Sequence, residues 1–296
     1  MHQDQLDIDN ELARQLIADQ FPQWTHLAIH RVAAAGTENA IFRVGNSLAA
    51  RLPLRAGNPT HVLRLLIDQA RAADEFNQVS PVRSPCRVAL GAPGYGYPLP
   101  WTVQTWLPGG DAIAEDPAGS DAFALDLVNL LTQLRSADAA GRSFSGAGRG
   151  GQLRDHDEWM DLCFANSQGL VDVVALRAMW TDLRGLPSID QDAMCHGDLT
   201  PQNVLVGAGR LMGVLDTGGF GAADPALDLV SVWHLLDRER RDLVRRQLRC
   251  SDVQWRRGMA WALQQAMGVV WYYVETNPVI SRWGQLTLAR LLGAAA

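Results

Sequence analysis

A short polar segment in the second half of the chain constrains its fold and its chemistry more than any other feature. The segment runs from His196 to Asn203, contains Asp198, and is followed thirteen residues later by Asp216. Residues 203–215 contain two runs rich in strand-forming residues, joined by a turn with two glycines. One strand of the predicted hairpin therefore begins at Asn203 and the other ends at Asp216, so both side chains finish at the same end of one hairpin.

Two carboxylates and one carboxamide at this spacing suit the transfer of a phosphoryl group. Such a transfer gathers negative charge, so Mg²⁺ must be held by hard oxygen ligands while an acceptor hydroxyl is brought into line. In this pattern Asp198 orients and deprotonates the hydroxyl, while Asn203 and Asp216 hold the metal. Taken alone, Asp198 is explained as a turn cap and Asn203 as a strand start. The combination with Asp216 predicts catalysis.

The motifs that follow Asp198 define a family resemblance. The chain resembles the aminoglycoside phosphotransferase family, whose members carry His-Gly-Asp-x-x-x-x-Asn, then Gly-Val-x-Asp, then Asp-Pro-x-x-Asp-Leu. These motifs stand here at residues 196–203, 213–216 and 224–229. The resemblance also includes residues 36–44, 51–53 and 106–109, and so covers nearly the whole chain in order.

The resemblance implies an α+β, two-lobed protein-kinase-like fold. Residues 1–107 would form a small nucleotide-binding lobe with an antiparallel sheet and one helix. Residues 108–296 would form a larger, mainly helical lobe with the catalytic loop and the acceptor-binding helices. The local patterns agree, because strand-like runs and a helix over 60–78 precede the boundary, whereas helical spacing of apolar residues dominates after it.

The resemblance also implies a reaction. The chain would transfer the γ-phosphate of ATP or GTP, with Mg²⁺, to a hydroxyl of a small molecule, frequently an antibiotic of the aminoglycoside, macrolide or nucleoside type, and so confer resistance. A metabolic kinase acting on choline, a sugar or an amino alcohol is an alternative, and a nucleotide-binding pseudokinase is another. The intact Asp198, Asn203 and Asp216 argue against the pseudokinase. The many tryptophans of the second half favour a bulky, partly apolar acceptor, and the alternative is that they pack in the core.

The sequence contains no lysine, and all 26 basic residues are arginines. Kinases ordinarily use a lysine of the third strand to hold the α- and β-phosphates. Arg51 occupies the matching place in the strand-like run 47–53, and its planar fork suits phosphate oxygens. The family resemblance leads us to expect an arginine there. The alternative is an arginine that faces solvent.

Other contacts to the nucleotide are less clearly marked. In the family a glutamate of the following helix fixes the cation, but Leu65 stands near that position here. Asp68 is the acid best placed to face the strand. Thr37, in the turn between the first two strands, is a candidate phosphate contact. Kinase-like folds pair the purine with backbone groups, here expected around Gln104, Trp106 and Leu107, so the choice between ATP and GTP stays open.

Three further polar residues have supporting roles in the predicted site. His196 is interpreted as a hydrogen-bonding residue that orients the loop rather than as an acid or base. In kinase-like folds an aspartate at the position of Asp228 accepts hydrogen bonds from the catalytic-loop backbone. Asp224 precedes Pro225 and is expected to cap a helix.

The composition of the chain limits which binding partners and which cellular location we expect. The net charge of -6 argues against nonspecific binding to nucleic acid or anionic lipid. No apolar run reaches the length that spans a bilayer, and the polar start is not a secretory signal. The four cysteines lack Cys-x-x-Cys spacing, so neither a zinc site nor a disulfide framework is indicated. We expect a cytoplasmic monomer or homodimer with a small-molecule substrate.

Overall fold

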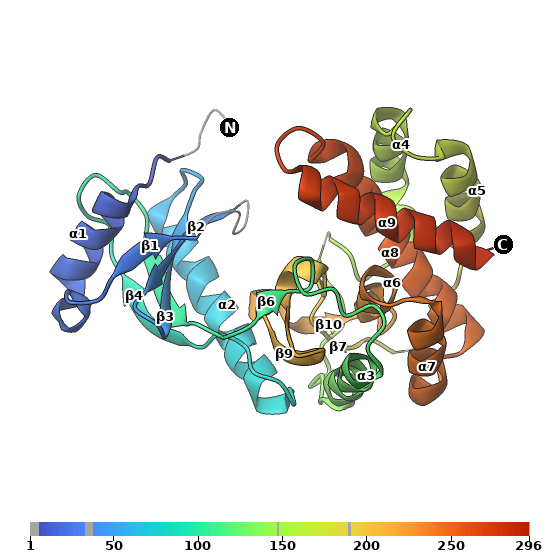
Figure 1. Cartoon of the computed structure of the whole chain (residues 1–296), viewed down its shortest axis with the longest axis horizontal. Helices are drawn as coiled ribbons and strands as arrows, with labels where there is room; N and C mark the ends of the chain where they lie inside the picture. Colours follow the sequence, from blue (N-terminus) through green and yellow to red (C-terminus); the bar gives the residue numbers. More distant parts are fainter. Residues whose placement is uncertain (1–5, 33–37, 147, 189–190, 296) are drawn as a thin grey trace. The chain divides into compact units, whose positions relative to one another are not determined.

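The computed structural model describes residues 6–32, 38–146, 148–188 and 191–295 (Figure 1). Contacts between Cα atoms divide the chain into two compact units. The amino-terminal unit comprises Met1–Glu75, Ser84–Pro108 and Asp216–Gly218, and the carboxy-terminal unit comprises Phe76–Arg83, Gly109–Leu215 and Gly219–Ala296. Each unit is therefore built from segments that are separated in the sequence.

A five-stranded antiparallel sheet with strand order β1-β2-β3-β5-β4 forms the framework of the amino-terminal unit. Its elements are α1 (Asn10–Gln20), β1 (Ile29–Arg31), β2 (Asn39–Val44), β3 (Leu48–Pro53), α2 (Pro59–Val79), β4 (Arg87–Gly91) and β5 (Trp101–Thr105). The helix α2 begins at the predicted place because Asn58 caps it. The Asn58 Oδ1 accepts the backbone N–H groups of Thr60 and His61 at 3.0 and 3.1 Å.

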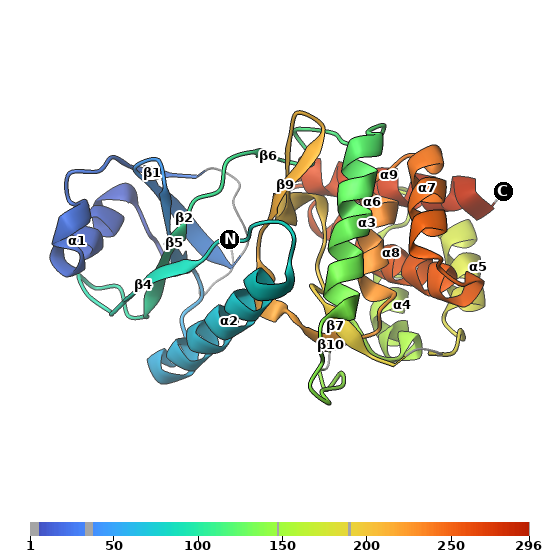
Figure 2. The same cartoon turned by 90° about the horizontal axis from the view of Figure 1, so that it is seen from below.

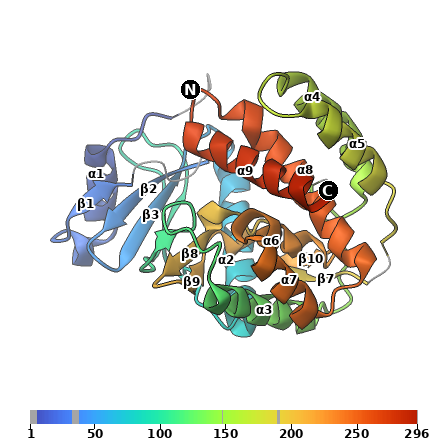
Figure 3. The same cartoon turned by 45° about the vertical axis from the view of Figure 1, so that its right-hand side comes forward.

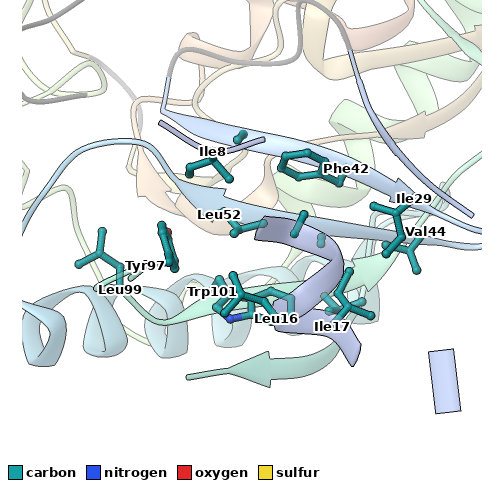
Figure 4. Close-up of a cluster of buried hydrophobic side chains, with 14 of the residues drawn as sticks. Ile8, Leu16, Ile17, Ile29, Phe42, Val44, Leu52, Tyr97, Leu99 and Trp101 are labelled. Atoms are coloured by element: carbon teal, nitrogen blue, oxygen red, sulfur yellow. The ribbon is translucent and has the colours of Figure 1, made fainter. Parts of the chain in front are cut away.

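One face of this sheet packs against α1 and is apolar. Along β2 the buried side chains alternate with half-buried ones, and Phe42 and Val44 lie on the buried face. They join Leu16 and Ile17 of α1 in a continuous core (Figure 4). The residues between them face the other way, so the second face of the sheet is free to carry polar side chains.

The carboxy-terminal unit combines two small sheets with most of the helices (Figure 2). The sheets have strand orders β6-β8-β9 and β10-β7. The strands are β6 (Gly110–Asp111), β7 (Ala193–Cys195), β8 (Val204–Gly207), β9 (Arg210–Val214) and β10 (Gly221–Ala223). The helices are α3 (Asp121–Ser136), α4 (Asp157–Asn166), α5 (Val173–Leu183), α6 (Val230–Leu235), α7 (Arg238–Leu248), α8 (Asp252–Tyr272) and α9 (Pro278–Ala295).

The long helix α8 is the centre of this unit. Ser251 caps its first turn through a hydrogen bond to the Gln254 backbone N–H. Its middle is buried on nearly all sides, because α4, α5, α6 and α9 contact it and α9 lies alongside it (Figure 3). Such a helix presents side chains to several neighbours at once, and one of its polar residues, Gln265, reaches the functional loop described below.

A buried ion pair connects α8 to the loop after β10. The Asp224 Oδ2 accepts hydrogen bonds from Nε and Nη2 of Arg257 at 2.8 and 2.6 Å, and from Nε1 of Trp261 at 2.8 Å. Asp224 is 3% exposed and Arg257 is 1% exposed. The Asp224 Oδ1 accepts the Ala226 backbone N–H at 2.9 Å. This contact lies in the turn before the 3-10 turn Leu227–Leu229, whose N-cap is Ala226 without a side-chain cap, so the prediction that Asp224 caps a helix is wrong.

Removal of the cation from this pair should destabilise the protein strongly. We expect Arg257→Met to lower the free energy of unfolding by about 3–5 kcal/mol, because Asp224 would be left charged and buried without its partner. Urea denaturation measures this loss. The neighbouring Arg256 pairs with Asp182 on the surface, so Arg256→Met should cost less than about 1 kcal/mol. Equal losses for the two variants would contradict this account.

The structure confirms the predicted helix over 60–78 as α2 and the predicted hairpin after Asn203 as β8 and β9. The segment after Ala226 is a 3-10 turn at Leu227–Leu229 followed by the short α6. The strands β6, β7 and β10 have only two or three residues each, too few for a periodic pattern to reveal them. In the described part of the chain, no helix combines the length and the apolar character needed to cross a membrane.

Candidate active site

The segment predicted to be catalytic forms a loop between β7 and β8. Gly197 has a φ of 83°, a left-handed conformation that favours glycine. The carboxylate of Asp228 accepts the backbone N–H groups of His196 at 2.7 Å and of Gly197 at 2.8 Å. Burial raises the pKa of Asp228, and the two backbone donors act in the opposite direction by stabilising its charged form. Asp228 therefore holds the loop through two backbone hydrogen bonds, as its supporting role predicts.

His196 uses both ring nitrogens to hold the backbone. Its Nδ1 accepts the Asp198 backbone N–H at 3.1 Å, so the ring proton is on Nε2, which donates to the Leu215 carbonyl at 2.8 Å. The side chain is buried against Phe76, with the ring centroids 6.0 Å apart. Because both ring nitrogens are hydrogen-bonded to the backbone, His196 orients the loop and has no nitrogen left for proton transfer.

Three side chains donate hydrogen bonds to the carboxylate of Asp198. Arg149 Nη2 lies 2.7 Å from Oδ1, and Gln265 Nε2 lies 2.5 Å from the same oxygen. Asn203 Nδ2 lies 2.9 Å from Oδ2. The Asp198 side chain keeps 39% of its surface exposed. Its carboxylate is thus fixed in one orientation while it stays accessible to a ligand.

Asn203 is positioned at the end of the predicted hairpin. Its backbone carbonyl accepts the Leu215 N–H at 2.7 Å, which closes the end of the hairpin directly before Asp216. Strands β8 and β9 are joined at Ala208 and Gly209, whose φ values of 49° and 70° suit a two-residue hairpin turn. The Asn203 amide nitrogen also donates to the Asp198 carbonyl at 3.0 Å. Because the nitrogen faces Asp198, the amide oxygen faces away from it and remains suited to a cation.

Asp216 belongs to the amino-terminal unit, where it forms an ion pair with Arg51. Arg51 Nη2 lies 3.3 Å from Asp216 Oδ1, and the two side chains are 26% and 55% exposed. The φ of Asp216 is 57°, in the left-handed region that aspartate and asparagine tolerate better than most residues. The acid partner of Arg51, which the sequence left open, is therefore Asp216 itself.

A polar cavity of about 60 Å³ surrounds this ion pair within the amino-terminal unit. Arg51 and Thr102 are a cross-strand pair of β3 and β5 on the polar face of the sheet, and both line the cavity with Gln104. One stripe of α2, with Leu66, Gln69, Ala70 and Ala73 at helical spacing, forms the opposite wall. The polar side chain of this stripe is a neutral glutamine, Gln69, and Leu65 is exposed and does not line the cavity.

Gly218 closes the cavity against α2. A Cβ atom added to Gly218 would lie 2.9 Å from the Cβ of Gln69, closer than side chains approach one another. Glycine is therefore required at this position. The residue between Asp216 and Gly218, Thr217, is buried and its hydroxyl lies 2.7 Å from that of Ser84. The Asp-Thr-Gly segment is thus fixed at both ends of its short turn.

The remaining predicted contacts to a nucleotide have mixed outcomes. Asp68 lies 3.7 Å from Arg71 on the exposed side of α2 and does not line the cavity. The Trp106 N–H donates to the Ser47 carbonyl at 2.7 Å, so it is already used within the sheet. Leu107 is half-buried directly after it. Thr37 lies outside the described residues.

Two polar residues of the site were not found from the sequence. Arg149 lies in a glycine-rich loop, and Gln265 lies in the middle of α8, 49 and 67 residues from Asp198. Neither has a local motif, so only the folded chain reveals them. Within the described residues, no cluster of three or more histidine, cysteine, aspartate or glutamate side chains is arranged to hold a metal. A magnesium site built from one carboxylate and one carboxamide would leave several positions for phosphate and water, as Mg²⁺ prefers.

Comparison with known proteins identifies relatives. Residues 29–261 match the phosphotransferase enzyme family. An aminoglycoside 3'-phosphotransferase of Streptomyces fradiae is 40% identical over 75 residues, which cover 21% of this chain and 28% of that protein. The matched segment therefore spans little more than a quarter of this curated relative.

Solved structures share the fold over nearly the whole chain. The GDP complex of wild-type aminoglycoside 2'-phosphotransferase-IIIa has a TM-score of 0.68 at 16% identity, covering 97% of this chain and 100% of that chain. Macrolide 2'-phosphotransferase MphH from Brachybacterium faecium has a TM-score of 0.61 at 18% identity, covering 95% and 97%. The predicted α+β fold of these kinase-like enzymes, with a small antiparallel sheet and a helical carboxy-terminal part, is confirmed.

Proposed function

Because the chain belongs to the phosphotransferase enzyme family, we propose that it is a magnesium-dependent O-phosphotransferase that moves the γ-phosphate of ATP or GTP to a hydroxyl of a small molecule. The observation that carries this proposal is the Asp198 carboxylate, held by three side-chain donors in a loop anchored by Asp228. A carboxylate with a fixed orientation and an exposed edge suits a general base. We place the enzyme in the cytoplasm, where nucleoside triphosphates are available.

The proposed reaction assigns one role to each side chain of the site. Asp198 accepts the proton of the acceptor hydroxyl as that oxygen forms a bond to the γ-phosphorus. The bond from the γ-phosphorus to the bridging oxygen breaks, and the nucleoside diphosphate leaves with its electron pair. Arg51 binds phosphate oxygens through its planar guanidinium. His196 and Asp228 hold the loop and take no part in proton transfer.

Asn203 and Asp216 are the proposed magnesium ligands. The chemistry of the donor set fits, because a carboxamide oxygen turned away from Asp198 and a half-exposed carboxylate are hard oxygen ligands. When bound, Mg²⁺ neutralises phosphate charge. Arg51 pairs with Asp216, and this contact places the carboxylate beside the guanidinium that would hold the phosphates.

Binding of the nucleotide, the phosphate donor, is assigned to residues 1–107. The polar cavity around Arg51 supports this assignment, and Gln104 lines it. We propose that backbone groups of Gln104, Trp106 and Leu107 bind the purine, with the Trp106 carbonyl rather than its N–H available, and that Thr37 lies near the phosphates. Solved relatives of the same fold are GDP and ADP complexes, which agrees with a purine nucleotide as donor.

The acceptor side is assigned to residues 108–296, and an antibiotic is the proposed acceptor. The relatives of this fold include enzymes named for aminoglycosides and macrolides, and one of them is a kanamycin complex. Trp159 of α4 and Tyr272 of α8 are 38% and 43% exposed, and Tyr272 follows Gln265 by two helical turns, or about 10 Å. An exposed tyrosine on the helix that also contacts Asp198, with an exposed tryptophan on the neighbouring α4, favours a bulky, partly apolar acceptor.

A transfer assay tests the proposed function. Nucleotide labelled at the γ-phosphate is incubated with the protein, Mg²⁺ and kanamycin, gentamicin, streptomycin, a macrolide, a nucleoside antibiotic or choline. We expect label on at least one antibiotic, and protection of a susceptible host that Asp198→Ala removes. Transfer to choline alone would favour a metabolic kinase. Nucleotide binding without transfer to any acceptor would indicate a pseudokinase.

Replacement of Arg51 should weaken nucleotide use without unfolding the chain. We expect Arg51→Met to lower kcat/KM for the nucleotide by about 10–100-fold, because charge-assisted hydrogen bonds to phosphate are lost. Arg71 lies on the exposed side of α2, so Arg71→Met should change this constant by less than about twofold. Steady-state kinetics with varied nucleotide separates the two, and an unchanged kcat/KM for Arg51→Met would exclude the phosphate role.

A further inference from the structure

A buried polar chain runs from α9 through α6 and α8 to the proposed base. Thr287 Oγ1 lies 3.0 Å from His234 Nδ1, His234 Nε2 lies 2.9 Å from Gln265 Oε1, and Gln265 Nε2 lies 2.5 Å from Asp198 Oδ1. The three residues behind Asp198 are almost fully buried, with exposures of 0%, 2% and 6%. We call Thr287, His234 and Gln265 the polar chain.

The Asp198 carboxylate at the end of the polar chain determines which group donates in each of its hydrogen bonds. An ionised carboxylate only accepts, so the Gln265 amide must turn its nitrogen to Asp198 and its oxygen to His234. His234 Nε2 must then carry the ring proton. Its Nδ1 is left as an acceptor, which the Thr287 hydroxyl satisfies as donor. If the ring proton moved to Nδ1, Nε2 would become an acceptor facing the Gln265 oxygen, and the hydrogen bond between His234 and Gln265 would be lost.

His234 is held in the neutral state that this direction requires. Burial lowers the pKa of His234 to about 3, the hydrogen bond with Gln265 opposes this shift, and the charges of Arg290 and Arg149 add to it. Arg290 also donates to the His234 carbonyl. The Trp283 ring packs against the imidazole, with the centroids 4.7 Å apart. The imidazole therefore stays a neutral donor at any pH at which the protein would work.

The lone pairs of Asp198 are divided unequally. Oδ1 receives Arg149 and Gln265, which together use both of its lone pairs. Among the residues that the structure describes, Oδ2 receives only the Asn203 amide, so one lone pair remains. We propose that Gln265 is a positioning residue, which the polar chain orients so that it occupies Asp198 Oδ1 and leaves Oδ2 to take the proton of the acceptor hydroxyl. This inference rests on the proposed function.

A spectroscopic test examines the polar chain without any turnover. The ¹⁵N chemical shifts of the His234 ring, assigned with His234→Gln, distinguish a protonated Nε2 from a protonated Nδ1. We expect Nε2 to carry the proton and to keep it from pH 8 to about pH 5, since the pKa of His234 is about 3. A proton on Nδ1, or a ring that becomes charged in this range, would overturn the inference.

Kinetics then test the positioning role. We expect Gln265→Leu to lower kcat by about 10–100-fold with little change in KM for the nucleotide, because a misplaced base slows the reaction without weakening nucleotide binding. His234→Leu should have a similar effect, whereas His234→Gln, which keeps a donor near Nε2, should recover most of kcat. The assay uses whichever of kanamycin, gentamicin or the macrolide the parent protein phosphorylates.

Gln264 provides a matched control. It is the preceding residue of α8, is 5% exposed, and contacts His156 instead of Asp198. Gln264→Leu should therefore leave kcat within about threefold of the parent. If Gln265→Leu does not fold, as thermal unfolding would show, the isosteric Gln265→Glu removes the donor and must lower kcat in its place. Equal kcat for the Gln264 and Gln265 variants would overturn the positioning role. If the parent protein transferred no phosphate, the proposed function would be refuted, and the ¹⁵N shifts would then test the polar chain by themselves.

Discussion

Asp198→Asn is expected to lower kcat by on the order of 10²–10⁴-fold, the contribution typical of a positioned general base. The substitution preserves the size of the side chain but removes the oxygen that can accept a proton from the acceptor hydroxyl. Arg149 and Gln265 donate to Asp198 in the parent protein. In the variant both residues can still donate hydrogen bonds to the amide oxygen of the asparagine, so the loop should keep its conformation.

Nucleotide binding and kcat measured on the same samples separate chemistry from folding. We expect the affinity of Asp198→Asn for nucleotide to stay within about threefold of the parent. Asp192 offers a control, because its carboxylate accepts the Phe144 backbone N–H at 2.7 Å and does not contact the loop carboxylate. Asp192→Asn should turn over normally. A kcat for Asp198→Asn within tenfold of the parent would show that another group accepts the proton.

Asp216→Asn is expected to remove most of the magnesium-dependent part of nucleotide affinity. Asparagine adopts the left-handed conformation of Asp216 at least as readily as aspartate, so the backbone at φ 57° should be preserved. Only the charge is lost. We expect a loss of about 3 kcal/mol, or roughly 10²-fold, because one of the two proposed protein ligands of the cation becomes neutral.

Calorimetry with and without Mg²⁺ isolates this effect from other contacts. Affinity for the nucleotide in the presence of a chelator should be similar for the parent and Asp216→Asn, whereas only the parent should gain affinity on addition of Mg²⁺. Asp68, on the exposed side of α2, provides the control, and Asp68→Asn should behave as the parent. A variant at Asp216 that gains as much affinity from Mg²⁺ as the parent would contradict the ligand role.

The parts of the site that lie close together in sequence were predictable, because local rules determine them. The hairpin between Asn203 and Asp216 follows from two β-rich runs and a glycine turn, and its ends meet through the Leu215 N–H as expected. Asp228 also occupies its expected place under the loop. Short motifs with fixed spacing carry this information because the chain between their residues has few conformations.

The parts that depend on packing between distant helices were not predictable. Arg149 and Gln265 reach Asp198 only because α8 passes through the middle of its unit, and a glutamine inside an apolar helix has no pattern that marks it. The partner of Arg51 was missed for a related reason. The spacing along α2 favoured Asp68 as the partner, whereas the structure turns a neutral stripe of α2 toward Arg51 and supplies Asp216 from a loop.

The most direct measurement of the central claim is the transfer of labelled γ-phosphate to a hydroxyl compound by the parent protein and by Asp198→Asn under identical conditions. The account predicts that the parent places the label on an antibiotic hydroxyl in the presence of Mg²⁺, and that the variant binds the nucleotide but transfers almost none. Equal transfer by both proteins, or label released only as inorganic phosphate by the parent, would contradict it.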